Sequence, residues 1–227
     1  NNVAGIEIEN SLHAEVYDNE AYNNTGGILV FDLPGLILKK GGHVKVYNNH
    51  VHDNNLANFA PKGNIVGKVP DGTGVIILAT SNVEVYKNRI VNNNSLSCGI
   101  ISYYMTEETF DKNEFDPYPK AVSVHDNYFE RENVKATMKG RFGKMCRFKL
   151  KFGKDVPHVI YDGILDEDLV KKHGSGPQDQ MVCVKNTQNQ SFANIDAEND
   201  FTNISRDDSE NNCELAPVQI SSKSSGQ

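Results

Sequence analysis

A phrase that recurs four times constrains the fold of this chain more than any other feature. It reads Ala14-Glu-Val-Tyr-Asp-Asn19, Val44-Lys-Val-Tyr-Asn-Asn49, Val83-Glu-Val-Tyr-Lys-Asn88 and Val122-Ser-Val-His-Asp-Asn127. Each copy places apolar side chains two residues apart, which is the period of a β-strand, and each copy ends on asparagine. Internal repetition of this kind indicates stacked units that share one continuous core.

Each repeat contains two further elements. A glycine and a short apolar run precede the phrase, at Gly5-Ile-Glu-Ile8, Gly27-Ile-Leu-Val30, Gly74-Val-Ile-Ile77 and Gly99-Ile-Ile-Ser102. An apolar residue follows it, and three copies then reach a second asparagine, at Asn24, Asn54 and Asn93. The sequence therefore predicts an all-β parallel solenoid with three strands per turn, in which corner asparagines stack along the axis. An antiparallel sandwich is the alternative, but it gives no reason for two asparagine rows in register.

The repeats divide the chain in two. Residues 1–132 are predicted to form the solenoid turns, with further turns upstream in the natural protein, and residues 133–227 to form an irregular extension that caps and docks. Within the extension, Asp166–His173 followed by Gly174 predicts one short helix. Six apolar residues should face outward from the first strands: Leu29, Phe31, Ile76, Leu78, Ile101 and Tyr103. We expect the chain's own loops or tail to cover them, with the tail folding back along this face; a partner surface is the alternative.

Composition excludes some functions. The net charge of -7 argues against a nucleic-acid partner bound through phosphates, and no apolar run approaches the ~18 residues of a membrane span. The four cysteines show no zinc-binding spacing. Cys183 and Cys213 both lie in the polar tail and are predicted to form a disulfide; the alternative is unpaired thiols, which would suit a reducing compartment.

The turns Gly27 to Asn54 and Gly74 to Asn93 resemble the right-handed parallel β-helix superfamily of pectate lyases, alginate epimerases and phage tailspikes. More closely, the chain resembles a bacterial family of exported parallel β-helix repeat-containing proteins that has no assigned activity. The residues that carry this resemblance are Asn2–Ser11, Asn24–Gly35, Asn58–Asn64, Asp116–Pro119 and Tyr161–Ile164. The resemblance implies a right-handed parallel β-helix that is exported to the periplasm, cell surface or exterior. It also implies a cytochrome-like protein partner, because such proteins are often encoded beside one.

Two candidate catalytic residues, Asp32 and Asp116, belong to loops that leave the same edge of the predicted stack, and His125 sits where the other turns have tyrosine. We assign Asp32, Asp116, His125 and Tyr103 to a polyuronate lyase or C5-epimerase site, which needs a base, an acid and a cation for the sugar carboxylate. Asp116-Pro-Tyr-Pro119 is similar to the Asp-Pro-His motif of alginate epimerases, although Tyr118 replaces the histidine. The alternative is that Asp32 and Asp116 only cap turns.

Substrate binding is assigned to Asn58, Lys62, Tyr118 and Arg141, the last of these within the basic stretch 133–154. His43, His50, His52 and Asp53 form a second cluster that could bind a transition metal, but surface histidine is the more common reading, so no metal ligand is predicted. Ca²⁺ stays open as a cofactor because of the many Asp and Asn side chains, although the GGxGxD calcium repeat is absent. Two functions are therefore expected: an exported β-helix that binds or processes a polysaccharide, or a non-catalytic scaffold for a protein partner.

Overall fold

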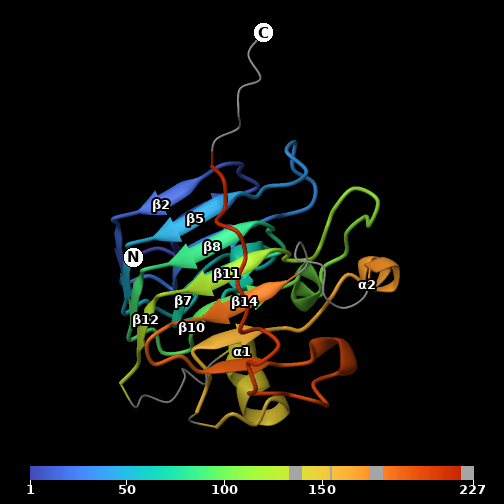
Figure 1. Cartoon of the computed structure of the whole chain (residues 1–227). Coiled ribbons are helices and arrows are strands. Elements are labelled where there is room, and N and C mark those ends of the chain that lie inside the picture. The colour runs from blue at the N-terminus through green and yellow to red at the C-terminus, as the bar shows by residue number, and fades with distance from the viewer. Residues whose placement is uncertain (133–139, 154, 174–180, 221–227) are drawn as a thin grey trace.

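The computed structural model describes residues 1–132, 140–153, 155–173 and 181–220. Its strands form three parallel β-sheets, which are the three sides of a prism (Figure 1). Sheet 1 contains β1 (Ala4–Glu9), β4 (Gly26–Phe31), β7 (Thr73–Leu78), β10 (Leu96–Ile101), β13 (Val159–Tyr161) and β15 (Phe192–Asn194). Sheet 2 contains β2 (Glu15–Tyr17), β5 (Val44–Tyr47), β8 (Val83–Tyr86), β11 (Val122–His125) and β14 (Val182–Lys185). Sheet 3 contains β3 (Glu20–Tyr22), β6 (His50–His52), β9 (Arg89–Val91) and β12 (Tyr128–Glu130). The predicted solenoid with three strands per turn is confirmed.

The register between turns follows the repeated phrase. In sheet 2, Val16 pairs with Val46, Val46 with Val85, and Val85 with Val124. All four valines are buried, and they line the same continuous core as the inward residues of sheets 1 and 3. Equivalent residues of successive turns therefore lie above one another, and this is what makes the outer face a set of straight residue columns.

Two ladders of asparagine side chains, all of them buried except Asn19, close the corners that flank sheet 3. In the first ladder, the side-chain amide of Asn19 donates to Asn49, Asn49 to Asn88 and Asn88 to Asn127, at 3.0, 2.9 and 3.0 Å. In the second ladder, Asn24 donates to Asn54 and Asn54 to Asn93, both at 3.0 Å. The residue before each asparagine of the first ladder has a left-handed backbone; Asp18, Asn48 and Asp126 are of the types that adopt it at low cost, and Lys87 is the exception. The predicted single file of corner asparagines is confirmed.

The apolar outer face of sheet 1 is covered by the chain's own insertions. Leu29 and Phe31 are buried, and Ile76 is 9% exposed. They pack with Val69 and with Tyr103 and Phe115 of the insertion that follows β10. Lys68 ties the two insertions together through its bonds to the Thr106 carbonyl and to Glu108. A partner surface on this face is therefore not supported.

The fourth turn differs from the predicted alignment. Residue Ser97, and not Gly99, occupies the position of Gly27 and Gly74, because Leu96 pairs with Thr73 and Gly99 with Ile76. The shift is two residues, so inward and outward faces are preserved. Ile101 still faces the insertions, but Tyr103 lies beyond the strand in a short 3-10 turn, Tyr103–Thr106.

Three strands beyond residue 132 extend the stack: β13 and β15 add to sheet 1, and β14 adds to sheet 2. Helix α1 (Gly140–Lys144), which continues as a π-helix to Lys149, precedes β13. Helix α2 (Glu167–His173) lies between β13 and β14 and confirms the predicted short helix. Among the described residues, no helix is long and apolar enough to cross a membrane.

The C-terminal segment runs along sheet 2 and not, as expected, along the apolar face of sheet 1 (Figure 1). The predicted Cys183–Cys213 disulfide is present and anchors the segment to β14. Further along, the Val218 amide donates to Glu84 of β8 at 3.1 Å. The physical reason for the difference is that the two insertions already cover sheet 1, whereas the Glu84 column of sheet 2 still offers charged partners.

Candidate functional site

The structure brings two of the four predicted catalytic residues together. Asp32 follows β4, and Asp116 lies in the insertion after β10; the two carboxylates are close enough that the charge of Asp116 contributes to raising the pKa of Asp32. Lys40 links them, because its ammonium donates to Asp116 at 2.9 Å while the next residue, Gly41, donates its N–H to Asp32 at 2.9 Å. Lys120 contacts Asp116 at 2.7 Å and Asp166 at 3.2 Å. Each carboxylate thus has a fixed partner within the loops.

The other two predicted catalytic residues lie elsewhere. His125 is on the outer face of sheet 2, where its ring contacts Glu84 at 3.2 Å and Asp126 at 2.8 Å. The hydrogen bond to Glu84 raises the pKa of His125; burial opposes this, and the bond to Asp126 adds to it. Tyr103 is 5% exposed and packs edge-on against Phe110 and Phe115. The contacts of these two side chains within the described part of the chain are with residues other than Asp32 and Asp116.

The predicted substrate-binding residues are dispersed as well. Asn58 donates to the carbonyls of Val66 and Val69 and so stabilises its own loop. Tyr118 lies beside Lys120, whose ammonium is 5.5 Å from the ring centre. Arg141 forms an ion pair with Glu107, and Lys62 is exposed. These four side chains therefore do not line one groove.

Asp32 is a buried carboxyl with an unusual environment. It is 2% exposed, and its Oδ1 has no hydrogen-bond partner among the described residues. Burial raises the pKa of Asp32 from 3.8 to about 6; the hydrogen bond from Gly41 acts in the opposite direction. Because an ionised carboxylate is disfavoured here, the folded protein binds a proton that the unfolded chain has already released between these two pH values.

We predict that Asp32→Asn increases stability at neutral pH. The wild-type contribution of Asp32 is most favourable below pH 3.8 and is lost as the pH rises through about 6. An amide cannot ionise, so the variant should be more stable by roughly 2 kcal/mol at pH 7.5 and equally stable near pH 4. Urea unfolding of both proteins across this range measures the difference, in which the other titrating groups cancel. A variant less stable at every pH would show that the carboxylate is needed in its charged form.

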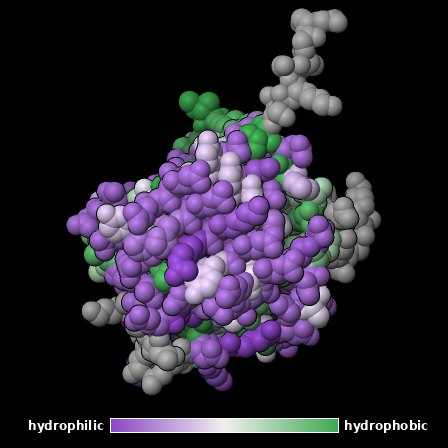
Figure 2. All heavy atoms as spheres, turned by 60° about the vertical axis from the view of Figure 1, so that its left-hand side comes forward, coloured by the Kyte–Doolittle hydropathy of each residue, from purple (hydrophilic) through white to green (hydrophobic). Residues whose placement is uncertain are grey.

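A polar depression of about 500 Å³ lies at the corner between sheets 2 and 3. It is lined by Lys87, Asn88, Arg89, Asp126, Asn127, Tyr128, Asn186 and Gln188. These residues belong to equivalent columns of three successive turns. The molecular face at this edge, where the strands of sheet 2 end, is almost entirely hydrophilic (Figure 2).

Two cations, one carboxylate and one aromatic ring give the depression its chemical character; the carboxylate, Asp126, is engaged by His125 at 2.8 Å. Lys87 and Arg89 are exposed, and Lys87 has no ion-pair partner among the described residues. Arg89 contacts Glu130 at 3.3 Å, and its guanidinium carbon is 4.5 Å from the ring centre of Tyr128. Amide, ammonium and guanidinium groups can donate hydrogen bonds to hydroxyl and carboxylate oxygens. The arrangement therefore suits a hydroxyl-rich ligand that carries negative charge.

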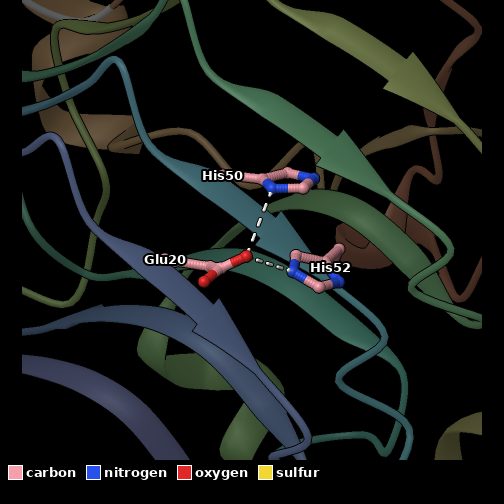
Figure 3. A group of neighbouring side chains, drawn as sticks. All are labelled: Glu20, His50 and His52. Atoms are coloured by element: carbon pink, nitrogen blue, oxygen red, sulfur yellow. Dashed lines mark hydrogen bonds and ion pairs between the residues drawn. The ribbon is translucent and has the colours of Figure 1, made fainter.

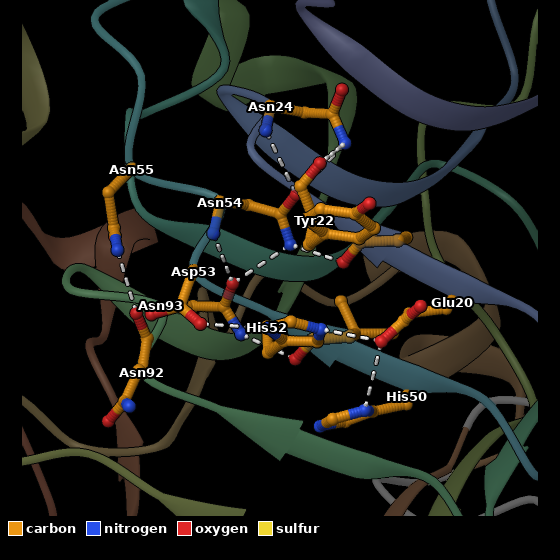
Figure 4. A network of polar contacts seen from close by, with 12 residues as sticks. Glu20, Tyr22, Asn24, His50, His52, Asp53, Asn54, Asn55, Asn92 and Asn93 are labelled. Carbon is orange, nitrogen blue, oxygen red and sulfur yellow. Dashed lines mark hydrogen bonds and ion pairs between the residues drawn. The ribbon is translucent and has the colours of Figure 1, made fainter. Parts of the chain in front are cut away.

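A histidine cluster lies on sheet 3, one turn before the turn that contains Arg89. One carboxylate oxygen of Glu20 on β3 contacts both His50 and His52 of β6, whose rings stack with their centres 4.1 Å apart (Figure 3). Asp53 contacts the far side of the His52 ring (Figure 4). Burial opposes protonation of His52, but its hydrogen bonds to Asp53 and Glu20 raise its pKa. Burial lowers the pKa of His50, and the neighbouring His52 adds to this effect. His43, which the sequence had grouped with them, instead stacks on His13 with ring centres 5.0 Å apart.

Sequence analysis did not identify Glu20 or the lining of the depression. The necessary signal was in the repeat itself. Aligning Asn19 with Asn49 places Glu20 beside His50, and aligning Asn88 with Asn127 places Arg89 beside Tyr128.

Comparison with known proteins gives one match. A family model described as "Right handed beta helix region" matches residues 1–139. No match was found among the curated proteins, and none was found among the solved structures.

Proposed function

This chain belongs to the right-handed β-helix family, and we propose that it binds a polysaccharide bearing carboxylate groups along the depression beside its first asparagine ladder. The observation that carries the proposal is the placement of Lys87 and Arg89 at the edge of an open, polar depression that also contains the Tyr128 ring. The family includes proteins that bind or process polysaccharides, which supports the ligand class. The columns repeat along the solenoid axis, so successive sugars of one linear chain would meet successive turns.

We propose that the protein binds the polysaccharide, and we propose no reaction. A lyase or epimerase centre requires a base, an acid and a cation around one sugar ring. Asp116 is already paired with Lys40 and Lys120, Asp32 is buried and accepts a hydrogen bond from the Gly41 N–H, and His125 and Tyr103 are engaged with other partners. The arrangement thus favours recognition of the polymer over its cleavage.

Export is part of the proposal. The Cys183–Cys213 disulfide is typical of proteins that fold in an oxidising compartment such as the periplasm or the exterior. The two remaining cysteines, Cys98 and Cys146, are buried and do not compete for this pairing. Polysaccharides of the cell envelope or surroundings would be accessible there.

The test is a calorimetric titration of the protein with oligogalacturonate. Replacing both Lys87 and Arg89 with alanine should weaken binding by about tenfold or more, because each cation supplies a charge-assisted hydrogen bond. Replacing Lys149 and Lys171 with alanine removes the same net charge from exposed sites on the π-helix and α2, and should leave the affinity nearly unchanged.

A methyl-esterified oligomer provides the ligand control, since it has the same sugars without the charge. It should bind more weakly to the wild-type protein. Equal affinity of the wild-type protein and the Lys87/Arg89 variant, or no binding of the charged oligomer, would contradict the proposal.

A further inference from the structure

Three potential metal ligands converge on the outer face of sheet 3. They are Oε1 of Glu20, Nδ1 of His50 and Nε2 of His52, and all three atoms lie within 4.8 Å of one another (Figure 3). Glu20 pairs directly with His50 in the strand register, and His52 follows two residues later on the same face. The backbone of two adjacent strands therefore fixes the positions of all three side chains.

The distances match a small tetrahedral site. His52 Nε2 is 3.1 Å and His50 Nδ1 is 3.7 Å from the same Glu20 oxygen. Zinc bonds to nitrogen and oxygen are about 2.0–2.1 Å long, so ligand atoms around a tetrahedral ion are separated by roughly 3.3–3.4 Å. Small side-chain rotations would thus bring the three atoms into place without moving the strands.

Asp53 supports the cluster from behind, because it contacts a ligand and not the metal position itself. Its Oδ2 lies 2.7 Å from Nδ1 of His52, opposite the nitrogen that faces Glu20 (Figure 4). A carboxylate in this position accepts a hydrogen bond from Nδ1–H and leaves the Nε2 lone pair for a metal, as in many zinc sites. The His52 ring is held further by stacking on Tyr22, with ring centres 5.2 Å apart.

Part of this arrangement occurs a second time in the molecule, and the comparison distinguishes a metal site from a purely structural contact. His125 is bonded to Asp126 and Glu84 in the same way that His52 is bonded to Asp53 and Glu20. The clamp of one histidine by two carboxylates therefore occurs twice. Only the Glu20 copy includes another histidine, His50, and it is the one group of three candidate ligands found among the described residues.

The charge balance also fits a divalent cation. Glu20 and Asp53 carry two negative charges beside two imidazoles that can be neutral. Arg89 pairs with His50 across the strands, but its guanidinium points to Glu130 and to the Tyr128 ring. Nitrogen and carboxylate ligands together favour zinc or a similar transition metal over Ca²⁺, which prefers oxygen ligands alone.

We propose that Glu20, His50 and His52 bind a divalent transition metal of the zinc type, and that Asp53 is a positioning residue for His52. Three protein ligands leave a coordination position open toward solvent. An oxygen ligand could enter there, but the site itself does not depend on polysaccharide binding, so either proposal can fail without the other.

The experiment is a Zn²⁺ titration of the tag-free chain in competition with a chromophoric chelator. We expect one ion per chain. His50→Asn and Glu20→Gln should each weaken the affinity about a hundredfold, and Asp53→Asn about tenfold. His125→Asn is the matched control, since it disrupts the similar clamp that lacks a second histidine, and it should leave the affinity unchanged.

NMR of the imidazole groups gives an independent readout. Added Zn²⁺ should shift the signals of His50 and His52 and leave those of His125 and His43 unchanged. The proposal is overturned if the wild-type chain shows no saturable uptake, or if His50→Asn binds Zn²⁺ as tightly as the wild type while remaining folded by circular dichroism.

Discussion

Replacing Asn88 with alanine should destabilise the protein by about 4 kcal/mol or more. The Asn88 amide donates to the carbonyl of Val46 at 2.9 Å and to the side chain of Asn127 at 3.0 Å, and its oxygen accepts from the backbone and side-chain amides of Asn49. Alanine leaves at least two buried polar groups without partners, and each such group costs about 1–3 kcal/mol, in addition to the lost packing. Chemical denaturation followed by circular dichroism measures the loss.

Asn19 of the same ladder is the matched control. Its amide donates to the Tyr17 carbonyl and to Asn49, but its side chain is exposed, whereas that of Asn88 is buried. Asn19→Ala should therefore cost only about 1 kcal/mol. Similar losses for the two variants would mean that the ladder does not carry the stability of the corners.

Replacing Gly27 with alanine should cost about 4 kcal/mol or prevent folding. A Cβ atom at this position would lie 2.3 Å from Cγ1 of Val51 and 2.6 Å from the Gly74 carbonyl oxygen. The valine could rotate, but the carbonyl belongs to the adjacent β-strand, so the two turns would have to separate. Overpacking in a rigid core costs about 1–3 kcal/mol when only side chains move and more when backbone must move.

Gly67 provides the control for this substitution. A Cβ atom there would meet its nearest atoms at 3.6 Å, which is ordinary contact. Gly67→Ala in the short 3-10 turn Ile65–Lys68 should thus change the free energy of unfolding by less than about 1 kcal/mol. A mild effect of Gly27→Ala would show that the turns are less tightly stacked than the structure indicates.

The architecture was predictable because its determinants repeat. The apolar alternation in each phrase predicts a β-strand, and the terminal asparagine predicts the corner that follows it. The sheets and the ladders could therefore be predicted from residues alone. The prediction was wrong in detail at the fourth turn. There, Ser97 replaces the inward glycine, and the downstream Gly99 mimics it two residues out of register.

The functional surfaces were harder to predict because they combine residues from different turns. His50, His52 and Asp53 are close in sequence and were recognised, but Glu20 is 30 residues before His50 and becomes its neighbour only in the stack. The predicted path of the C-terminal segment was also wrong. Cys213 and Val218 belong to an irregular, non-repeating stretch, so only the disulfide gave any indication of where it docks.

The central claim is that a carboxylate-bearing polysaccharide binds at the corner between sheets 2 and 3. Amide chemical-shift perturbation in a ¹⁵N-labelled chain titrated with oligogalacturonate tests it most directly. We expect the largest shifts in Lys87–Arg89, Asp126–Tyr128 and residues 186–188, which line the depression. Shifts concentrated instead in Asp32–Gly41 and Asp116–Lys120 would contradict the claim and move the binding site to the loop edge of sheet 1.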